Sequence, residues 1–371
     1  MVTINSLGLR KAPTDTRVVV AMSGGVDSSV TAALLNEEGY EVIGITMQLY
    51  DHGAAISRKG ACCAGQDIAD AGAVAASIGI PHYVLNYERK FESDVIKPFA
   101  DSYIRGETPI PCVLCNQTVK FRDLLNAAQD LGADALATGH YIRRSEELGE
   151  VNLYRAQDET KDQSYFLFST TREQLRLLRF PLGDLKKEET RDLADRFELP
   201  VAKKPDSQDI CFVPNGRYAE VVKKLHPEAD GPGEIVDLEG KKVGVHDGII
   251  NFTIGQRRGL KIGGTENPLY VVKLDPHKRR VIVGPSDALE CRTIELRDVN
   301  WLFNFETSIP IECEVKVRSS SQLVGARVTP KSDNAALVDL SIAAKGVAPG
   351  QACVFYSGER LLGGGWILRD E

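Results

Sequence analysis

The hexapeptide SGGVDS at residues 23–28 is the part of this sequence whose residue types most clearly suggest chemistry. Its two glycines lack Cβ atoms and let backbone N–H groups approach an anion closely, while Ser23 and Ser28 add hydroxyl donors. Neither the lysine of GxxxxGK[ST] nor the spacing of GxGxxG is present. Asp27 is anionic, so beside a pyrophosphate it makes sense chiefly through a bound cation such as Mg²⁺. The hexapeptide therefore predicts a phosphate-binding loop of a third kind, and the alternative is a tight turn with an Asp–Ser cap.

A CxxC motif formed by Cys112 and Cys115 is the second candidate. The pattern predicts a helix over 116–131, so both thiols would lie just ahead of a helix N-terminus, where the dipole favours the thiolate. A zinc site would need a second cysteine pair, and the adjacent Cys62 and Cys63 are poorly spaced for one. A redox pair and a zinc half-site both stay open at this point.

The remaining cysteines divide by their surroundings. Cys211 follows a polar, turn-prone segment at 204–209, so we expect it, like Cys115, to be partly exposed and reactive. Cys291, Cys313 and Cys353 lie in strand-like runs and are most simply core residues.

The elements that must position these residues alternate between strand and helix. A strand over 17–22, a helix over 28–38 and a strand over 41–47 form one βαβ unit. Alternation of this kind predicts a parallel sheet with helices on both faces, the α/β class. The further elements expected in the same domain are helices over 67–80, 116–131 and 186–197 and strands over 82–86 and 134–138.

The character of the chain changes after residue 213. Glycine and proline punctuate a small mixed segment, and later runs alternate polar and apolar residues, as in a small β-barrel or sandwich. We expect three domains, at 1–213, 214–288 and 289–371.

Composition limits the other possibilities. The chain has 371 residues, of which 43% are hydrophobic, and it contains no apolar run of about 18 residues and no signal-peptide pattern, so we expect a cytoplasmic protein with no membrane partner. The net charge of −7 gives no global reason to expect nucleic acid. The segment 253–280 is locally basic, however, with seven Lys and Arg, among them Arg257 and Arg258, against two acidic residues. A solvated charged face is the alternative for this segment.

The SGGVDS loop resembles the pyrophosphate-binding loop (PP-loop) of ATP-dependent adenylating enzymes with an adenine-nucleotide α-hydrolase-like fold. Those enzymes split ATP between the α and β phosphates and turn a substrate oxygen into a leaving group. The resemblance implies that the loop holds the phosphates, that Asp27 binds Mg²⁺, and that Met47 and Gly139 flank the adenosine. The loop residues concerned are Ala21, Met22, Ser23, Gly24, Gly25, Val26, Asp27 and Ser28.

Motifs along nearly the whole chain resemble the bacterial tRNA-specific 2-thiouridylases. They are SGGVDS, PCVLCN, ATGHY, KDQSYF, DSQDICF, GQRRGL and LGGG, in this order. The resemblance implies ATP-dependent adenylation of the C2 oxygen of wobble uridine in the tRNAs for Lys, Glu and Gln, followed by sulfur transfer. It further implies sulfur supplied by a cysteine desulfurase through relay proteins.

The same resemblance assigns roles to single residues. Cys211 would carry a persulfide, and Cys115 would be its partner thiol, able to release sulfide or form a transient disulfide. The implied contacts with the tRNA anticodon stem-loop are Lys161, Asp162, Gln163, Arg318 and Ser319, and in this light Arg257 and Arg258 become candidate phosphate contacts.

One position departs from a common family pattern, because Cys112 stands where many members have Asp. A thiol is a poor replacement for a carboxyl group in acid–base chemistry. The substitution also creates a three-cysteine set, since Cys112, Cys115 and Cys211 could ligate a [4Fe–4S] cluster. The persulfide and cluster mechanisms are both open on the sequence.

Two other functions compete. A PP-loop amidating or condensing ligase acting on a small molecule would need no cysteine pair at its site, and an ATP-sensing RNA-binding module would leave Cys115 and Cys211 without a purpose.

Overall fold

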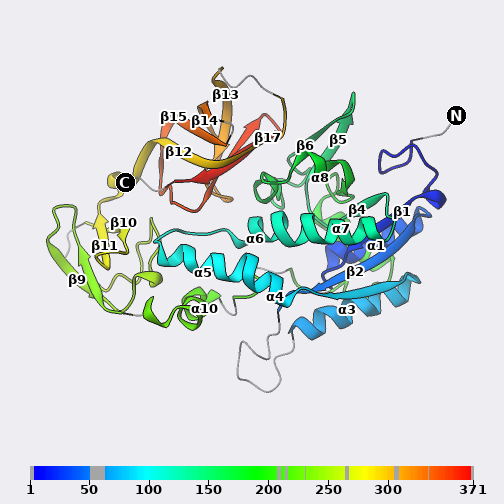
Figure 1. The fold of residues 1–371 in the computed structure, drawn as a ribbon, viewed down its shortest axis with the longest axis horizontal. Helices are drawn as coiled ribbons and strands as arrows, with labels where there is room; N and C mark the ends of the chain where they lie inside the picture. Colours follow the sequence, from blue (N-terminus) through cyan, green and yellow to red (C-terminus); the bar gives the residue numbers. More distant parts are fainter. Residues whose placement is uncertain are drawn as a thin grey trace. The chain divides into compact units, whose positions relative to one another are not determined.

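The computed structural model describes residues 4–50, 63–206, 210–213, 216–229, 231–263, 267–304, 309–332 and 334–368 (Figure 1). The chain divides into two compact units. The first comprises Met1–Asp94, Val113–Gln208 and Glu359–Leu361, and the second comprises Val95–Cys112, Asp209–Gly358 and Leu362–Glu371. No helix in these described ranges is long and apolar enough to span a membrane.

The first unit is built on the predicted parallel sheet, and the α/β class is confirmed. Its strand order is β3-β2-β1-β4-β7, with every pairing parallel. Val18 and Val20 of the first strand are fully buried and face one core with helix residues such as Val30. The strands are β1 (Arg17–Ala21), β2 (Glu41–Gln48), β3 (His82–Asn86), β4 (Ala135–Ala137) and β7 (Leu178–Arg179).

Three helices of this unit matter for the site. Helix α1 packs against both α3 and α9. Gly39, which follows the C-cap residue Glu38 of α1, takes a φ of +85°, the left-handed conformation that ends a helix. The bounds are α1 (Val26–Glu37), α3 (Cys63–Ile78) and α9 (Lys187–Arg196), close to the predicted ranges.

The unit also holds elements that the sequence pattern did not predict. A hairpin of β5 (Arg143–Glu147) and β6 (Glu150–Tyr154) pairs with Arg360 and Leu361 near the end of the chain. Such a pairing joins residues about 200 positions apart, and local pattern does not predict it. Short helical elements not used below are Pro13–Asp15, Glu88–Phe91, Ser164–Leu167 and Arg172–Leu177.

The predicted helix start at residue 116 is wrong. The chain is already helical at α6 (Pro111–Leu114), continues through a π-helical segment (Cys115–Leu124) and ends in α7 (Leu125–Asp130). Proline suits a first helical turn because that position needs no backbone N–H. The two cysteines of the CxxC motif therefore lie within a helical stretch rather than ahead of one.

The second unit contains the small mixed domain and the barrel. Its four-stranded sheet has the order β10-β11-β8-β9. The strands are β8 (Gly233–Val236), β9 (Lys242–His246), β10 (Tyr270–Asp275) and β11 (Arg280–Gly284). Helices α5 (Lys97–Ile104) and α10 (Tyr218–Leu225) pack together, with Tyr103 stacked on Tyr218 at 4.6 Å between ring centroids. Short helical elements are Glu92–Ile96, which spans the division between the units, Pro227–Ala229, Ile249–Asn251 and Ser286–Leu289.

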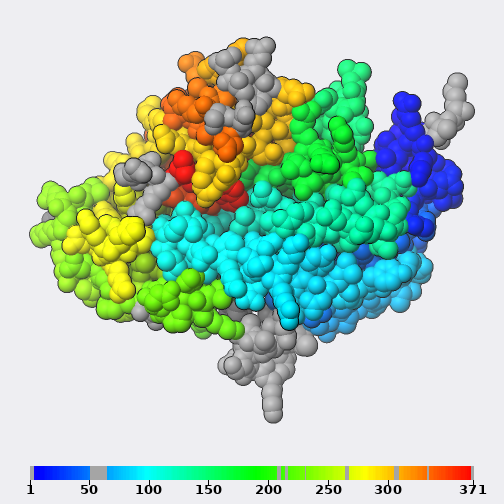
Figure 2. Space-filling view, viewed as in Figure 1, coloured from blue at the N-terminus to red at the C-terminus, as the bar shows by residue number. Residues whose placement is uncertain are grey.

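The barrel is an antiparallel sheet whose first and last strands also pair, as predicted. Its inner residues, among them Val315, Val338 and Phe355, are fully buried. In Figure 1 its strands, gold to red, lie together, and Figure 2 shows the surface of the same residues in these colours. They are β12 (Glu290–Trp301), β13 (Ile311–Lys316), β14 (Val324–Ser332), β15 (Ala335–Lys345), β16 (Ala352–Ser357) and β17 (Arg360–Ile367).

Candidate functional site

The SGGVDS segment lies where β1 turns into α1, at the carboxyl end of the parallel sheet, where open α/β sheets bind ligands. Gly25 is the N-cap residue and gives α1 no side-chain cap. Ser28 Oγ accepts a hydrogen bond from Ser23 N–H (3.1 Å), and Ser29 Oγ donates to Gly25 O (2.7 Å). The serines therefore hold the shape of the loop at a helix N-terminus that favours anions.

Two glycines permit close backbone contacts with this loop. Gly24 has a φ of +73°, and a Cβ there would lie 2.2 Å from the backbone oxygen of Asp67. A Cβ on Gly139, just after β4, would lie 2.8 Å from the backbone nitrogen of Ser28. Any side chain at either position would therefore displace the loop, and the predicted place of Gly139 beside the adenosine stays a prediction.

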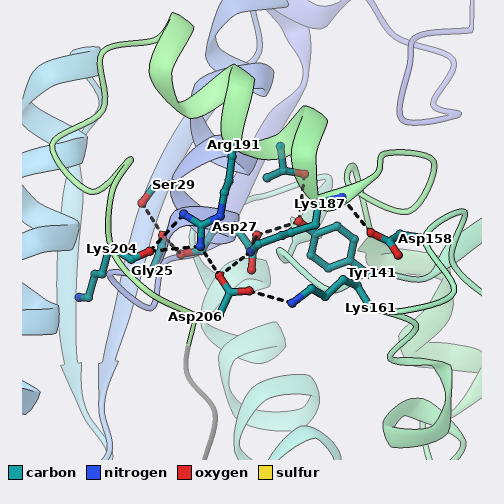
Figure 3. Close-up of polar contacts among 12 residues, drawn as sticks. Gly25, Asp27, Ser29, Tyr141, Asp158, Lys161, Lys187, Arg191, Lys204 and Asp206 are labelled. Atoms are coloured by element: carbon teal, nitrogen blue, oxygen red, sulfur yellow. Dashed lines mark hydrogen bonds and ion pairs between the residues drawn. The ribbon is translucent and has the colours of Figure 1, made fainter.

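Asp27 of the loop forms an ion pair with the ammonium group of Lys187 (Figure 3). Its Oδ1 accepts hydrogen bonds from Lys187 Nζ (2.6 Å) and from the Tyr141 hydroxyl (2.8 Å). The Lys187 side chain is 11% exposed and its Nζ also lies 3.0 Å from Asp206 Oδ1. One buried ammonium group thus bridges two carboxylates beside the predicted phosphate site.

Asp206 is the centre of a cationic cluster, which comprises Lys161, Lys187 and Arg191 in Figure 3. Besides Lys187, it accepts from Lys161 Nζ (2.9 Å) and Arg191 Nη2 (2.6 Å). Burial acts to raise the pKa of Asp206, but the hydrogen bonds from Lys161 and Lys187 outweigh it and lower the pKa to about 2. Asp206 therefore stays ionised and holds the three cations beside the loop.

Lys204 fixes the loop from its other side. Its Nζ donates to Gly24 O (2.9 Å), Asp67 Oδ1 (2.7 Å) and Asp70 Oδ2 (2.5 Å). Burial acts to lower the pKa of Lys204, but hydrogen bonds to Asp67 and Asp70 raise it. Lys204 therefore ties the phosphate loop to α3.

The KDQ motif at residues 161–163 faces this same network. Gln163 Oε1 accepts from Tyr141 N–H (2.9 Å), and Gln163 N–H donates to Tyr141 O (3.0 Å). The Asp162 carboxylate is 2% exposed and accepts from Ala156 N–H, Ser164 N–H and Ser164 Oγ. In this structure Gln163 supports the backbone of Tyr141, and direct tRNA contact by the residues of the motif stays a prediction.

Comparison with known proteins gives matches along the whole chain. Family models described as a tRNA methyl transferase HUP domain, PRC-barrel domain and an aminomethyltransferase β-barrel domain match residues 16–215, 219–285 and 291–367. A tRNA-specific 2-thiouridylase of Parvibaculum lavamentivorans is 62% identical over 100% of this chain and 95% of that protein. Proteins of the same name from Rhodospirillum centenum and Jannaschia sp. are 61% and 59% identical, covering 99% and 98% of this chain and 95% and 97% of those proteins. The chain belongs to the tRNA-specific 2-thiouridylase family.

The domain models carry a methyl-transferase name, whereas the full-length relatives are named thiouridylases. Identity near 60% over the full chain is the more specific finding, so the thiouridylase assignment holds. The HUP, PRC-barrel and β-barrel descriptions agree with the predicted order of a parallel-sheet domain, a mixed domain and a barrel.

The cysteines of this thiouridylase-family chain differ in exposure. Cys112 and Cys211 are exposed, but Cys115 is only 6% exposed, so the expectation of a partly exposed Cys115 is wrong. Cys353 is fully buried in the barrel core and Cys313 is partly buried against it, and burial raises the pKa of both thiols, that of Cys313 to about 12. Cys291 is partly buried against the barrel core.

Among the described residues, no group of three His, Cys, Asp or Glu side chains lies close enough together to hold a metal ion. A [4Fe–4S] cluster held by Cys112, Cys115 and Cys211 stays a prediction. Cys62 lies outside the described residues, as does the side chain of Cys63.

The residues missed by sequence reasoning are the charged partners of the loop. Lys187 and Arg191 stand four residues apart on one face of a predicted helix, a spacing that could have marked them as a pair. Lys204 and Asp206 precede Cys211 in a segment whose composition indicates only a polar turn.

Met47 lies half-buried on β2, next to Leu85 of β3 in register.

Replacing Asp206 tests the cationic cluster through stability. Because the pKa is lowered in the folded chain, Asp206 contributes stability above about pH 4, and that contribution is lost as pH falls towards 2. We expect Asp206→Asn to lower the free energy of unfolding by about 2 kcal/mol at pH 7, and by less below pH 4. Urea unfolding at several pH values measures this. The exposed Asp192→Asn in α9 is the control, and equal effects of the two variants would contradict the prediction.

Proposed function

We propose that this thiouridylase-family enzyme adenylates the C2 oxygen of the wobble uridine, U34, in the tRNAs for Lys, Glu and Gln, and then replaces that oxygen by sulfur. The observation that carries the proposal is the convergence of the uncapped α1 N-terminus, Asp27 and Lys187 at one edge of the parallel sheet. A phosphate chain needs such donors and cations, and full-length identity to thiouridylases supports tRNA as the substrate.

The phosphate loop binds ATP, with Met47 and Gly139 beside the adenosine. Asp27 is the residue that would hold Mg²⁺, because its carboxylate is 34% exposed at the loop, and the metal would neutralise phosphate charge there. The uridine C2 oxygen attacks the α phosphate, an O–P bond forms, and pyrophosphate leaves. Lys187 stabilises the departing pyrophosphate, since its ammonium group already lies at the loop and is held there by Asp206.

The sulfur step uses two cysteines. Cys211 receives a sulfur atom as a persulfide from a cysteine desulfurase or sulfur-relay protein, because an exposed thiol is accessible to a donor protein. The terminal sulfur forms a bond to C2, and the C2–O bond to AMP breaks. The Cys115 thiolate displaces that sulfur from Cys211, which leaves a Cys115–Cys211 disulfide that a thiol reductant must reopen.

One assay separates this function from a small-molecule ligase. We expect pyrophosphate release from ATP to depend on added substrate tRNA and the product tRNA to contain 2-thiouridine. Release that is independent of tRNA and driven by ammonia or an amino acid would establish the ligase instead.

We also propose 1–213, 214–288 and 289–371 as the domain limits.

The tRNA backbone is proposed to contact the exposed Arg257 and Arg258. Neither side chain makes an ion pair with another described residue, whereas Lys261 lies 3.7 Å from Asp247 and Arg280 lies 3.2 Å from Glu234. A charge without an intramolecular partner is available for phosphate.

We expect the double variant Arg257→Ala/Arg258→Ala to weaken tRNA binding. The slope of log K for tRNA binding against log salt concentration should also flatten by about one to two units. Each phosphate contact releases a counterion when it forms, and the variant forms fewer contacts. Filter binding at several salt concentrations measures this. Lys261→Ala is the control, and an unchanged slope in the double variant would show that these arginines are only solvated.

A further inference from the structure

Tyr141 is held so that its hydroxyl group faces the phosphate loop (Figure 3). The residue is only 3% exposed. Gln163 pairs with both its backbone N–H (2.9 Å) and its backbone oxygen (3.0 Å). Lys187 Nζ lies 5.7 Å from the centroid of its ring. The ring is therefore packed on all these sides, and its hydroxyl group has a defined place beside Asp27.

The hydroxyl group of Tyr141 lies between a carboxylate and a second hydroxyl. Its oxygen is 2.8 Å from Asp27 Oδ1 and 2.9 Å from Thr190 Oγ1. Burial raises the pKa of this hydroxyl, the hydrogen bond with Thr190 acts to lower it, and Asp27 raises it further. The group therefore keeps its proton. Because a carboxylate can only accept, that proton serves Asp27, and the Thr190 hydroxyl has a proton of its own.

Helix α9 brings two side chains to this point. Thr190 is fully buried and stands one helical turn after Lys187, so both lie on the face of α9 that packs against α1. Lys187 Nζ contacts Asp27 Oδ1 directly (2.6 Å), whereas Thr190 reaches the same oxygen only through the Tyr141 hydroxyl. Two donors from different parts of the chain therefore meet at one oxygen of Asp27.

The two oxygens of the Asp27 carboxylate thus differ. Both hydrogen bonds end on Oδ1, and Oδ2 has no hydrogen-bond or ion-pair partner among the residues that the structure describes. The side chain is nevertheless 34% exposed. Magnesium is bound through one or two carboxylates together with substrate phosphates. Oδ2 is therefore the oxygen of Asp27 that fits such a cation.

We propose that Tyr141 is a positioning residue for Asp27, whose hydroxyl group, backed by Thr190, keeps Oδ1 engaged and leaves Oδ2 for Mg²⁺. The inference rests on the proposed binding of Mg²⁺ by Asp27. Hydrogen bonds to a metal-binding carboxylate fix its orientation. Lys187 alone gives a weaker constraint, because an ammonium group on a flexible stem can follow the carboxylate as it turns.

Tyr141→Phe tests the hydroxyl group alone, because the phenyl ring keeps the packing and the contact with Lys187. The probe is Mn²⁺, whose free concentration is measured by electron paramagnetic resonance in the presence of the full-length protein and α,β-methylene ATP. This analogue cannot be cleaved between the α and β phosphates, so the readout is independent of adenylation. We expect the Kd for Mn²⁺ to rise by about 10-fold or more.

Tyr40→Phe is the matched control. Tyr40 is 4% exposed, and its hydroxyl oxygen also makes two hydrogen bonds, with Ser6 Oγ (2.7 Å) and Leu7 N–H (3.3 Å), away from the phosphate loop. Loss of a buried tyrosine hydroxyl by itself should therefore leave Mn²⁺ binding unchanged. Equal Mn²⁺ affinities of the Tyr141→Phe and Tyr40→Phe variants would overturn the proposal.

Thr190→Val provides a second test. We expect it to weaken Mn²⁺ binding in the otherwise unchanged protein and to cause no further loss in the Tyr141→Phe background, because Thr190 acts through the Tyr141 hydroxyl. An equal loss in both backgrounds would refute that path. Asp27→Ala separates the two proposals. If it leaves Mn²⁺ binding unchanged, the proposed Mg²⁺ site fails, and if it weakens binding while Tyr141→Phe does not, only the role of Tyr141 fails.

Discussion

Asp27→Ala is expected to abolish AMP formation with substrate tRNA and to leave tRNA binding nearly unchanged. Asp27 holds both Lys187 and Tyr141 at the phosphate loop and is the proposed Mg²⁺ ligand, so its loss disorganises the place where the α phosphate reacts. Lys187→Ala should reduce adenylation by about 100-fold or more, as for removal of one preorganised charge from a transition state.

The control for Lys187 is its neighbour Lys186→Ala, whose side chain is exposed and should be dispensable. The measurement is radiolabelled AMP and pyrophosphate formation at saturating ATP and tRNA. Unchanged AMP formation in Asp27→Ala would refute the assignment of SGGVDS as the phosphate loop. Normal adenylation in Lys187→Ala would show that Lys187 only holds Asp206 in place and takes no part in adenylation.

Cys211→Ser and Cys115→Ser are each expected to eliminate thiolation while AMP formation continues. Activation of the C2 oxygen precedes sulfur attack, so the first half-reaction needs neither thiol. Cys313→Ala is the control, because burial raises the pKa of that thiol to about 12 and keeps it unreactive. Thiolated tRNA is measured by its retarded migration in a mercury-containing gel. Full thiolation by Cys211→Ser would overturn the assignment of function, not only of mechanism.

Cys112→Asp separates the two sulfur mechanisms that the sequence leaves open. Under the persulfide mechanism the variant should thiolate tRNA normally, since it restores the residue common in the family. Under a cluster mechanism a hard carboxylate replaces a thiolate ligand, so bound iron and activity should fall together. Iron content and the absorption of anaerobically purified protein near 400 nm decide between them, and an iron-free active enzyme excludes the cluster.

The sequence alone predicts those features that depend on short-range pattern. Three such features are local, because a few neighbouring residues determine backbone conformation there. They are the turn from β1 to α1, the positions of glycine in the SGGVDS loop, and the alternation of strands and helices. Strand β3 (His82–Asn86) matches its predicted range for this reason. The motifs also lead to the thiouridylase family, since their order along the chain is a property of the sequence.

Tertiary structure decides which charges meet. Asp27 and Lys187 are 160 residues apart, and Lys204 and Asp70 are 134 apart, so no periodicity relates them. Packing also decides the exposure of Cys115, because the local pattern suggests a partly exposed thiol but the folded chain buries it. Arg318 bonds the backbone oxygen of Ile254 only because the barrel and the mixed domain pack within one unit. Side-chain contacts between distant segments depend on the packing of whole elements, and short-range sequence pattern does not reveal that packing.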